Sequence, residues 1–165
     1  MQLNHYNTSF TKKTFPITVI CDNVTNAPNL GSLFRICDAF GVEELILCGD
    51  VSLGRKIRKT SRATEKTVSH QICKSTLDAV NRLKNKGYQI ISLEITSTSK
   101  PLHSTTFSKE KPIALIIGDE NFGVSENILN LSNTIIHIDM FGQNSSMNVT
   151  QAATITLYEM IKQFL

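Results

Sequence analysis

Three clusters of small polar residues and glycines follow apolar runs of the sequence, and they hold most of the side chains that could do chemistry. They span residues 23–35, 118–125 and 140–150. In open α/β sheets, ligands bind beyond the carboxyl ends of the strands. Because all three clusters occupy that position, the sequence predicts that they form one composite site.

The second cluster, residues 118–125, has two interpretations. Its glycines, Gly118 and Gly123, let the backbone approach a ligand closely. A loop that leads into a helix capped by Ser125 is the simpler alternative. The cluster has neither the G-x-G-x-x-G spacing of a dinucleotide site nor the G-K-[ST] of a phosphate loop, so a nucleotide hydrolase is poorly supported.

The other two clusters are rich in amide and hydroxyl side chains. Asn23, Asn26 and Asn29 lie in the first, and residues 144–148 form the sequence NSSMN in the third. Turn formation and helix capping account for one or two of these residues in each cluster. The remainder are available to bind a ligand.

Arg35 lies within an expected amphipathic helix, residues 29–40, between the bulky residues Phe34 and Ile36. Its side chain either extends to solvent or uses its planar five-donor head to hold a phosphate or to steer a hydroxyl.

A second basic feature covers residues 55–66, which carry six cations and one acid. Such a run is usually a solvated helical face, and it also suits binding of phosphates.

The elements expected around these clusters indicate an α/β fold. Apolar runs at residues 17–21, 44–48, 88–93, 113–117 and 135–138 alternate with segments of helical period. This alternation predicts a mostly parallel sheet with helices on both faces. Further helices are expected at residues 75–86 and from Val149 onwards, Gly41 is expected to end the first helix, and residues 97–111 are expected to be a polar loop.

Composition sets the remaining limits. The 165 residues suit a single domain, residues 1–165, without a separate RNA-binding domain. No apolar stretch approaches the roughly 20 residues of a membrane span, so a cytoplasmic protein with no membrane association is expected. The four cysteines lack the spacing of a zinc site and are expected to be reduced, mostly buried and without metal. A net charge of +3 permits an anionic partner.

Taken together, the three clusters resemble the TrmH-like (SpoU) branch of the SPOUT superfamily, over about residues 17–162. The members of this branch are tRNA and rRNA 2′-O-ribose methyltransferases. The resemblance is carried by Asn29 and Arg35 in NVTNAPNLGSLFR, by Glu120 in GDENFGVS, and by IDMFG and SMNVT in the third cluster. It implies a C-terminal trefoil knot, a methyl donor S-adenosylmethionine, an RNA substrate (tRNA or rRNA) and a homodimer. In this family the arginine of one subunit often completes the site of the other.

The resemblance also implies roles for individual residues. The residues expected at the donor are Leu93, Gly118, Ile138, Ser146 and Met147. The residues expected at the reaction are Arg35, Asn29, Glu120, Ser146 and Asn148. Arg35 would take or steer the proton of the ribose 2′-hydroxyl with help from the substrate phosphate, because an arginine alone is a poor base. Asn29 and Ser146 would orient Arg35 and the ribose, Glu120 would shape the site, and Asn148 would brace the loops.

Two positions depart from the family pattern. Asn26-Ala27 precedes Pro28-Asn29 where a D-P-x-N step is usual, and Asp139 stands where the usual I-P-M has proline. Two other functions remain open on the sequence. One is an RNA-binding or assembly protein that kept the knot and lost catalysis, and the other is a base-methylating enzyme of the same superfamily.

Overall fold

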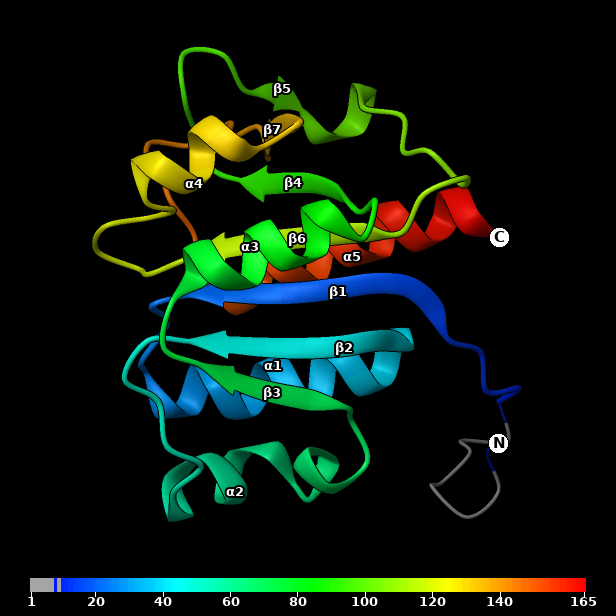
Figure 1. The fold of residues 1–165 in the computed structure, drawn as a ribbon, viewed down its shortest axis with the longest axis vertical. Helices are drawn as coiled ribbons and strands as arrows, with labels where there is room; N and C mark the ends of the chain where they lie inside the picture. Colours follow the sequence, from blue (N-terminus) through cyan, green and yellow to red (C-terminus); the bar gives the residue numbers. More distant parts are fainter. Residues whose placement is uncertain (1–7, 9) are drawn as a thin grey trace.

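The strands form one sheet in the computed structural model, which describes residue 8 and residues 10–165. The strands are β1 (Phe15–Asp22), β2 (Val42–Cys48), β3 (His70–Cys73), β4 (Gln89–Leu93), β5 (Lys100–Pro101), β6 (Ile113–Gly118) and β7 (Thr134–His137). They lie in the order β3-β2-β1-β6-β4-β7-β5, and every strand pairing among these residues is parallel (Figure 1). The expected parallel sheet is therefore confirmed.

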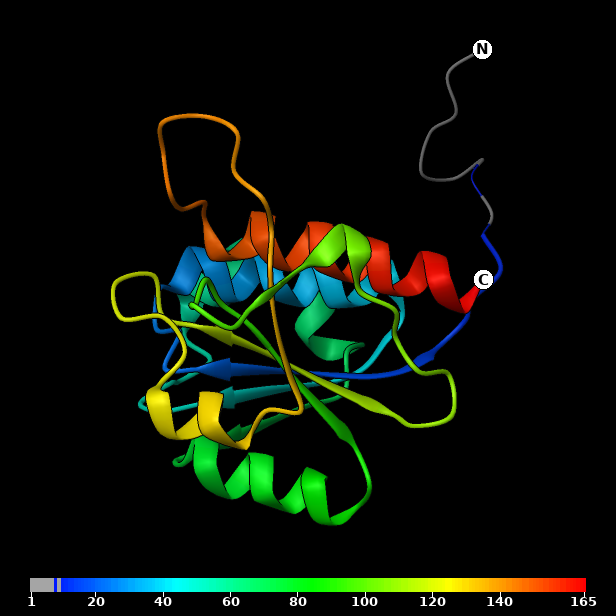
Figure 2. The same cartoon turned by 90° about the horizontal axis from the view of Figure 1, so that it is seen from above.

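Helices cover both faces of this sheet, as expected. They are α1 (Ala27–Phe40), α2 (Arg55–Ser61), α3 (Thr76–Asn85), α4 (Glu126–Leu131) and α5 (Val149–Phe164), with short 3-10 helices η1 (Thr64–Lys66) and η2 (Leu102–Ser104). Figure 2 shows α1 and α5 on one side of the sheet and α3 and α4 on the other. In the described part of the chain, no helix is both long and apolar enough to cross a membrane.

The core lies on both sides of the central strands β1 and β6, whose apolar residues are almost all fully buried. Such strands read as continuous apolar runs because neither of their faces meets water. Three of the four free cysteines, Cys21, Cys37 and Cys48, are buried here. Burial raises the pKa of the Cys37 thiol from 9.0 to about 12 and that of Cys48 to about 11, so neither thiol ionises near neutral pH.

Local signals set the bounds of α1. Asn26 caps its first turn by accepting a hydrogen bond from the backbone N–H of Asn29 at 3.1 Å. Gly41 ends the helix in the left-handed conformation, with φ of 62°, as expected. The expectation of a polar loop at residues 97–111 was wrong in part, because β5 and η2 lie within it. The trefoil knot depends on how the chain is threaded, not on strand order, and it stays a prediction.

Candidate active site

A cavity of about 460 Å³ opens at the carboxyl ends of β4, β6 and β7. All five residues that the sequence assigns to the methyl donor line it, namely Leu93, Gly118, Ile138, Ser146 and Met147. The strand ends supply the first three, and the loop before α5 supplies Ser146 and Met147. The structure therefore brings the expected donor residues together, while their role stays a prediction.

The loop from Gly118 to Val124 forms one wall of the cavity and packs tightly against the end of β6. A Cβ added to Gly118 would lie 2.1 Å from the carbonyl carbon of Gly123 and 2.3 Å from the nitrogen of Val124. Gly123 has a φ of 67° and donates its N–H to the carbonyl of Asp119 at 2.8 Å. Glycine is thus required at both positions, at one for space and at the other for conformation.

Glu94, which the sequence did not single out, fixes the same loop from β4. Its Oε2 accepts a hydrogen bond from the N–H of Val124 at 2.9 Å, and its Oε1 accepts one from its neighbour Ile95 at 2.9 Å. A Cβ on Gly123 would meet the Glu94 carboxylate at 2.2 Å. Because Glu94 also lines the cavity, it joins two of the cavity walls.

Asp22, a second residue that was missed, holds the far end of the loop from the end of β1. It is 1% exposed and accepts hydrogen bonds from the Thr76 hydroxyl at 2.6 Å and from both the N–H and the hydroxyl of Ser125, at 2.9 and 2.6 Å. Ser125 does stand at the N-cap of α4, but its side chain bonds to Asp22 instead of capping the helix. The available signal was a carboxylate directly after an apolar run.

The three sequence clusters meet in a polar triangle formed by Asn29, Glu120 and Asn148. Oε1 of Glu120 accepts hydrogen bonds from Nδ2 of Asn29 at 2.6 Å and from Nδ2 of Asn148 at 2.9 Å. Asn148 Nδ2 also lies 3.2 Å from Oδ1 of Asn29, to which it donates. Glu120 lines the cavity as well, so the triangle borders it. These contacts place the N-termini of α1 and α5 beside the loop after β6.

Asn148 has a second task, since its Oδ1 caps α5 by accepting the N–H of Thr150 at 2.8 Å. Capping therefore explains one face of this side chain and the triangle explains the other. Ser146, two residues earlier, is exposed and lines the cavity.

Arg35 lies on a different face of α1 from Asn29. The two residues are six positions apart, which places them about 120° apart around the helix axis. Gly31 and Asp38 share the face of Arg35, and they contact Thr60 of α2 and Thr67, which follows η1. The Arg35 side chain is exposed and is not among the residues that line the cavity of its own chain. A single subunit thus does not place Arg35 at the donor.

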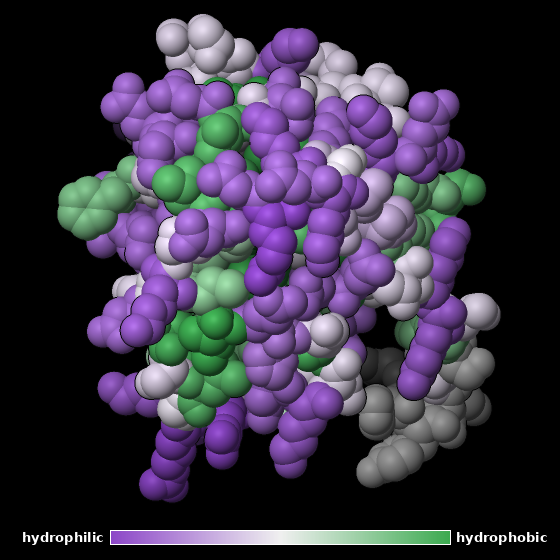
Figure 3. All heavy atoms as spheres, viewed as in Figure 1, coloured by the Kyte–Doolittle hydropathy of each residue, from purple (hydrophilic) through white to green (hydrophobic). Residues whose placement is uncertain are grey.

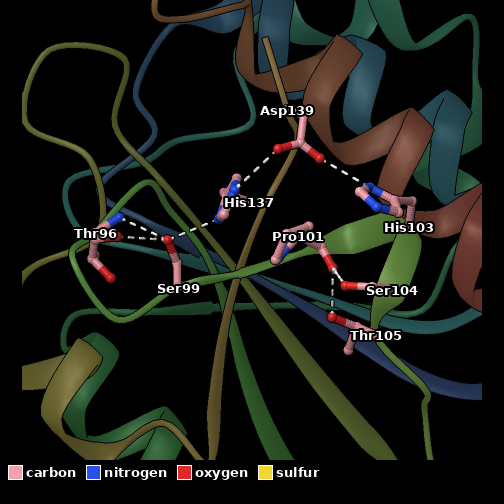
Figure 4. A network of polar contacts seen from close by, with 8 residues as sticks. All are labelled: Thr96, Ser99, Pro101, His103, Ser104, Thr105, His137 and Asp139. Atoms are coloured by element: carbon pink, nitrogen blue, oxygen red, sulfur yellow. Dashed lines mark hydrogen bonds and ion pairs between the residues drawn. The ribbon is translucent and has the colours of Figure 1, made fainter.

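Asp139, where the family pattern has proline, lies between two histidines at the end of β7 (Figure 4). Its carboxylate oxygens are 2.9 Å from Nδ1 of His103 and 3.5 Å from Nε2 of His137. The second nitrogen of His137 lies 2.9 Å from the hydroxyl of Ser99, which belongs to the segment between β4 and β5. The side chain that replaces proline therefore contacts both histidines, and its Oδ2 atom is buried.

A second groove, of about 450 Å³, runs between α5, η2 and the end of α1. Apolar side chains dominate it, and three of them are well exposed: Phe141 at 95%, Tyr158 at 63% and Ile155 at 44%.

Across the described residues, no group of three or more potential metal ligands lies together.

The family model described as the SpoU rRNA Methylase family matches residues 16–158. The tRNA (guanosine(18)-2′-O)-methyltransferase of Thermus thermophilus is 30% identical over 147 residues, which cover 89% of this chain and 75% of that protein. The enzyme of the same name from Aquifex aeolicus is 30% identical over 92% of this chain and 72% of its own length.

Solved structures agree with these matches. The crystal structure of the A. aeolicus TrmH/SpoU tRNA modifying enzyme superposes with a TM-score of 0.82 at 28% identity, covering 92% of this chain and 77% of that one. An rRNA methyltransferase from Sinorhizobium meliloti, solved with AdoMet bound, has the same fold, with a TM-score of 0.85 at 22% identity over 94% of this chain and 59% of that one.

Proposed function

We propose a function for this chain on the premise, shown by the match over residues 16–158, that it belongs to the SpoU rRNA methylase family. The chain transfers a methyl group from S-adenosylmethionine to a ribose 2′-hydroxyl of tRNA or rRNA. Relatives at 30% identity are named for this reaction. The observation that carries the function is the cavity at the ends of β4, β6 and β7, bordered by the triangle of Asn29, Glu120 and Asn148.

The cavity fits the donor. Its volume lies within the range of sites for small molecules, and its lining combines apolar side chains with backbone groups at strand ends. Gly118 keeps the backbone free of a side chain at the point where β6 meets the cavity loop. Leu93, Ile138 and Met147 would hold the apolar parts of the donor, and Ser146 would supply a hydroxyl. When bound there, S-adenosylmethionine supplies an electrophilic methyl group on a sulfonium.

The chain's own polar residues prepare the acceptor. Asn29 and Ser146 orient the ribose, and Glu120 keeps both asparagine amides in place through its Oε1. Asn148 holds the start of α5 against α1. Arg35 takes or steers the proton of the 2′-hydroxyl, aided by the phosphate beside it. Positioning of the two reactants supplies much of the rate in such a displacement.

The chain works as a homodimer in the cytoplasm, in which Arg35 of one subunit serves the cavity of the other. Two features support this arrangement. Arg35 is exposed and stands apart from the cavity of its own chain. The groove beside α5 exposes Phe141, Ile155 and Tyr158, which a second copy would cover.

The activity is tested with radiolabelled S-adenosylmethionine and bulk tRNA and rRNA, followed by nuclease digestion and identification of the labelled nucleoside. The expected product is a 2′-O-methylated nucleoside, and Arg35→Ala should lower turnover by about 10²- to 10⁴-fold. A labelled base would refute ribose methylation. Undiminished turnover of Arg35→Ala would remove Arg35 from the mechanism.

The dimeric site is tested by mixing two inactive variants. Arg35→Ala lacks the arginine, and Ala152→Phe fills the cavity, which Ala152 lines. If the arginine acts across the dimer, random exchange of subunits gives one intact site in half of the dimers, hence about a quarter of wild-type activity. An inactive mixture of folded, dimeric variants would place Arg35 in its own subunit's site.

A further inference from the structure

The exposed side of α2 and η1 carries a concentration of positive charge that we call the basic surface. It consists of Arg55, Lys56, Arg58, Lys59, Arg62 and Lys66, all of them exposed. In the described part of the chain, none of the six forms an ion pair. The one acid of the segment, Glu65, is half-buried and accepts a hydrogen bond from the Ser61 hydroxyl. That bond lowers the pKa of Glu65, and neighbouring Lys66 and Arg58 lower it further.

This surface holds more than the whole net charge of the protein. Residues 55–66 carry six cations and one anion, whereas the rest of the chain carries eleven cations and thirteen anions. The segment therefore has a net charge of +5 on a protein that is otherwise slightly negative. Figure 3 shows hydrophilic side chains projecting from the edge of the molecule where α2 lies in Figure 1.

The basic surface is held firmly against α1. Ile57 is 2% exposed and Ser61 is fully buried, so α2 turns these residues inward and its cations outward. Gly31 of α1 lies so close to α2 that a Cβ would come within 2.8 Å of the carbonyl of Ile57. Since Arg35 shares the face of α1 that meets α2 and η1, its side chain leaves α1 on the side that carries the basic surface.

We infer that the basic surface, together with Arg35, binds the sugar–phosphate backbone of the RNA substrate. This inference rests on the proposed function and adds the place where the RNA is held. Unpaired, exposed cations fixed on a packed helix are suited to phosphates, which they bind with release of counterions. No aromatic residue stands among residues 55–66, so the surface positions the strand without stacking on its bases.

An anionic membrane is the less favoured partner. Helices that lie on a bilayer insert an apolar face between the lipids. The apolar residue in the middle of α2, Ile57, is instead buried against the core of the protein. The charge of α2 is thus available to a polyanion, and no apolar side chain accompanies it.

The test compares two double variants with the same loss of charge. Lys56→Gln/Lys59→Gln removes two cations from the basic surface, and Lys86→Gln/Lys109→Gln removes two exposed cations outside it. Affinity for tRNA is measured from 50 mM to 1 M salt. The first variant should lower the slope of log affinity against log salt by about 1.4 to 1.8, because each phosphate contact contributes about 0.7 to 0.9. If the affinities converge near 1 M, this corresponds to roughly 15- to 30-fold weaker binding at 0.15 M.

Two further measurements separate this inference from the proposed function. Methyl transfer by the wild type reports on the function, and calorimetry with S-adenosylmethionine shows that both double variants keep the donor site. If the two double variants have equal slopes of log affinity for tRNA against log salt, while the wild type transfers methyl groups normally, the inference is overturned and the proposed function stands. Loss of binding to phosphatidylserine vesicles with unchanged binding to tRNA would assign the surface to a membrane and also overturn it.

Discussion

Replacing Gly118 with alanine puts a methyl group into space that the cavity loop already fills. The new Cβ would lie 2.1 Å from the Gly123 carbonyl carbon and 2.3 Å from the Val124 nitrogen, whereas ordinary contact begins at 3.4 Å. These neighbours are backbone atoms, so no side chain can rotate away, and the loop must retreat by about 1 Å. That movement breaks the bond between Val124 and the Glu94 carboxylate.

A hydrogen bond to a charged group contributes about 1.5–3 kcal/mol. We therefore expect Gly118→Ala to weaken binding of S-adenosylmethionine by roughly 10- to 100-fold, since about 1.4 kcal/mol corresponds to a factor of ten. Isothermal titration calorimetry measures this loss directly. The melting temperature should fall by about 3–12 °C.

The matched control is Gly142→Ala, in the loop between β7 and α5. A Cβ there meets no atom within 4 Å, so this variant should bind the donor like the wild type. If Gly118→Ala binds S-adenosylmethionine as tightly as Gly142→Ala does, the loop does not form the wall of the donor site, and our account of the cavity is wrong.

Three further predictions concern packing, the polar triangle and the buried thiols. Gly31→Ala should separate α2 from α1 and lower the free energy of unfolding by up to about 2 kcal/mol in urea titrations, after allowing for the better helix propensity of alanine. Gly54→Ala should not, because its Cβ would meet only the Ser52 carbonyl oxygen, in ordinary contact at 4.0 Å. Glu120→Ala leaves the buried amide of Asn29 without its acceptor and should cost about 1–3 kcal/mol by the same measurement, whereas Glu120→Gln, which keeps an acceptor oxygen, should cost less. The raised pKa of Cys37 means that its thiol ionises first in the unfolded chain, so the contribution of Cys37 to stability should be constant below about pH 9 and fall from pH 9 towards pH 12; Cys37→Ser, compared with wild type, should lessen the fall.

The fold could be predicted from the sequence wherever one residue pattern had a single physical solution. The runs that became β1, β4 and β6 are mostly apolar because both faces of these strands are buried. Gly41 ended α1 because the left-handed conformation there excludes most side chains. The edge strand β3 was missed, since His70–Cys73 is short and only half-buried, and its pattern does not differ from that of a loop.

The sequence predicted that most residues of the candidate site lie close together, whereas it did not predict the hydrogen bonds that hold them. Asn29, Glu120 and Asn148 were expected at one site, and the structure joins them by direct hydrogen bonds. Asp22 and Glu94 were missed because their partners lie 103 and 30 positions away in the chain, and no local spacing links them. The position of Arg35 follows from helical geometry, which the motif conceals by placing it close to Asn29 in sequence.

The pairing of β1 with β6 has a consequence for how the protein is made. Ile17 of β1 lies opposite Ile113 of β6, so one edge of β1 has no strand beside it until most of the chain has left the ribosome. The β1–β2–β3 half is then a sheet with an open apolar edge, which is prone to pair with other nascent chains. Pairings of such long range also close slowly. Yield during overexpression should therefore depend on the rate of synthesis and on chaperones more than the stability of the finished domain would suggest.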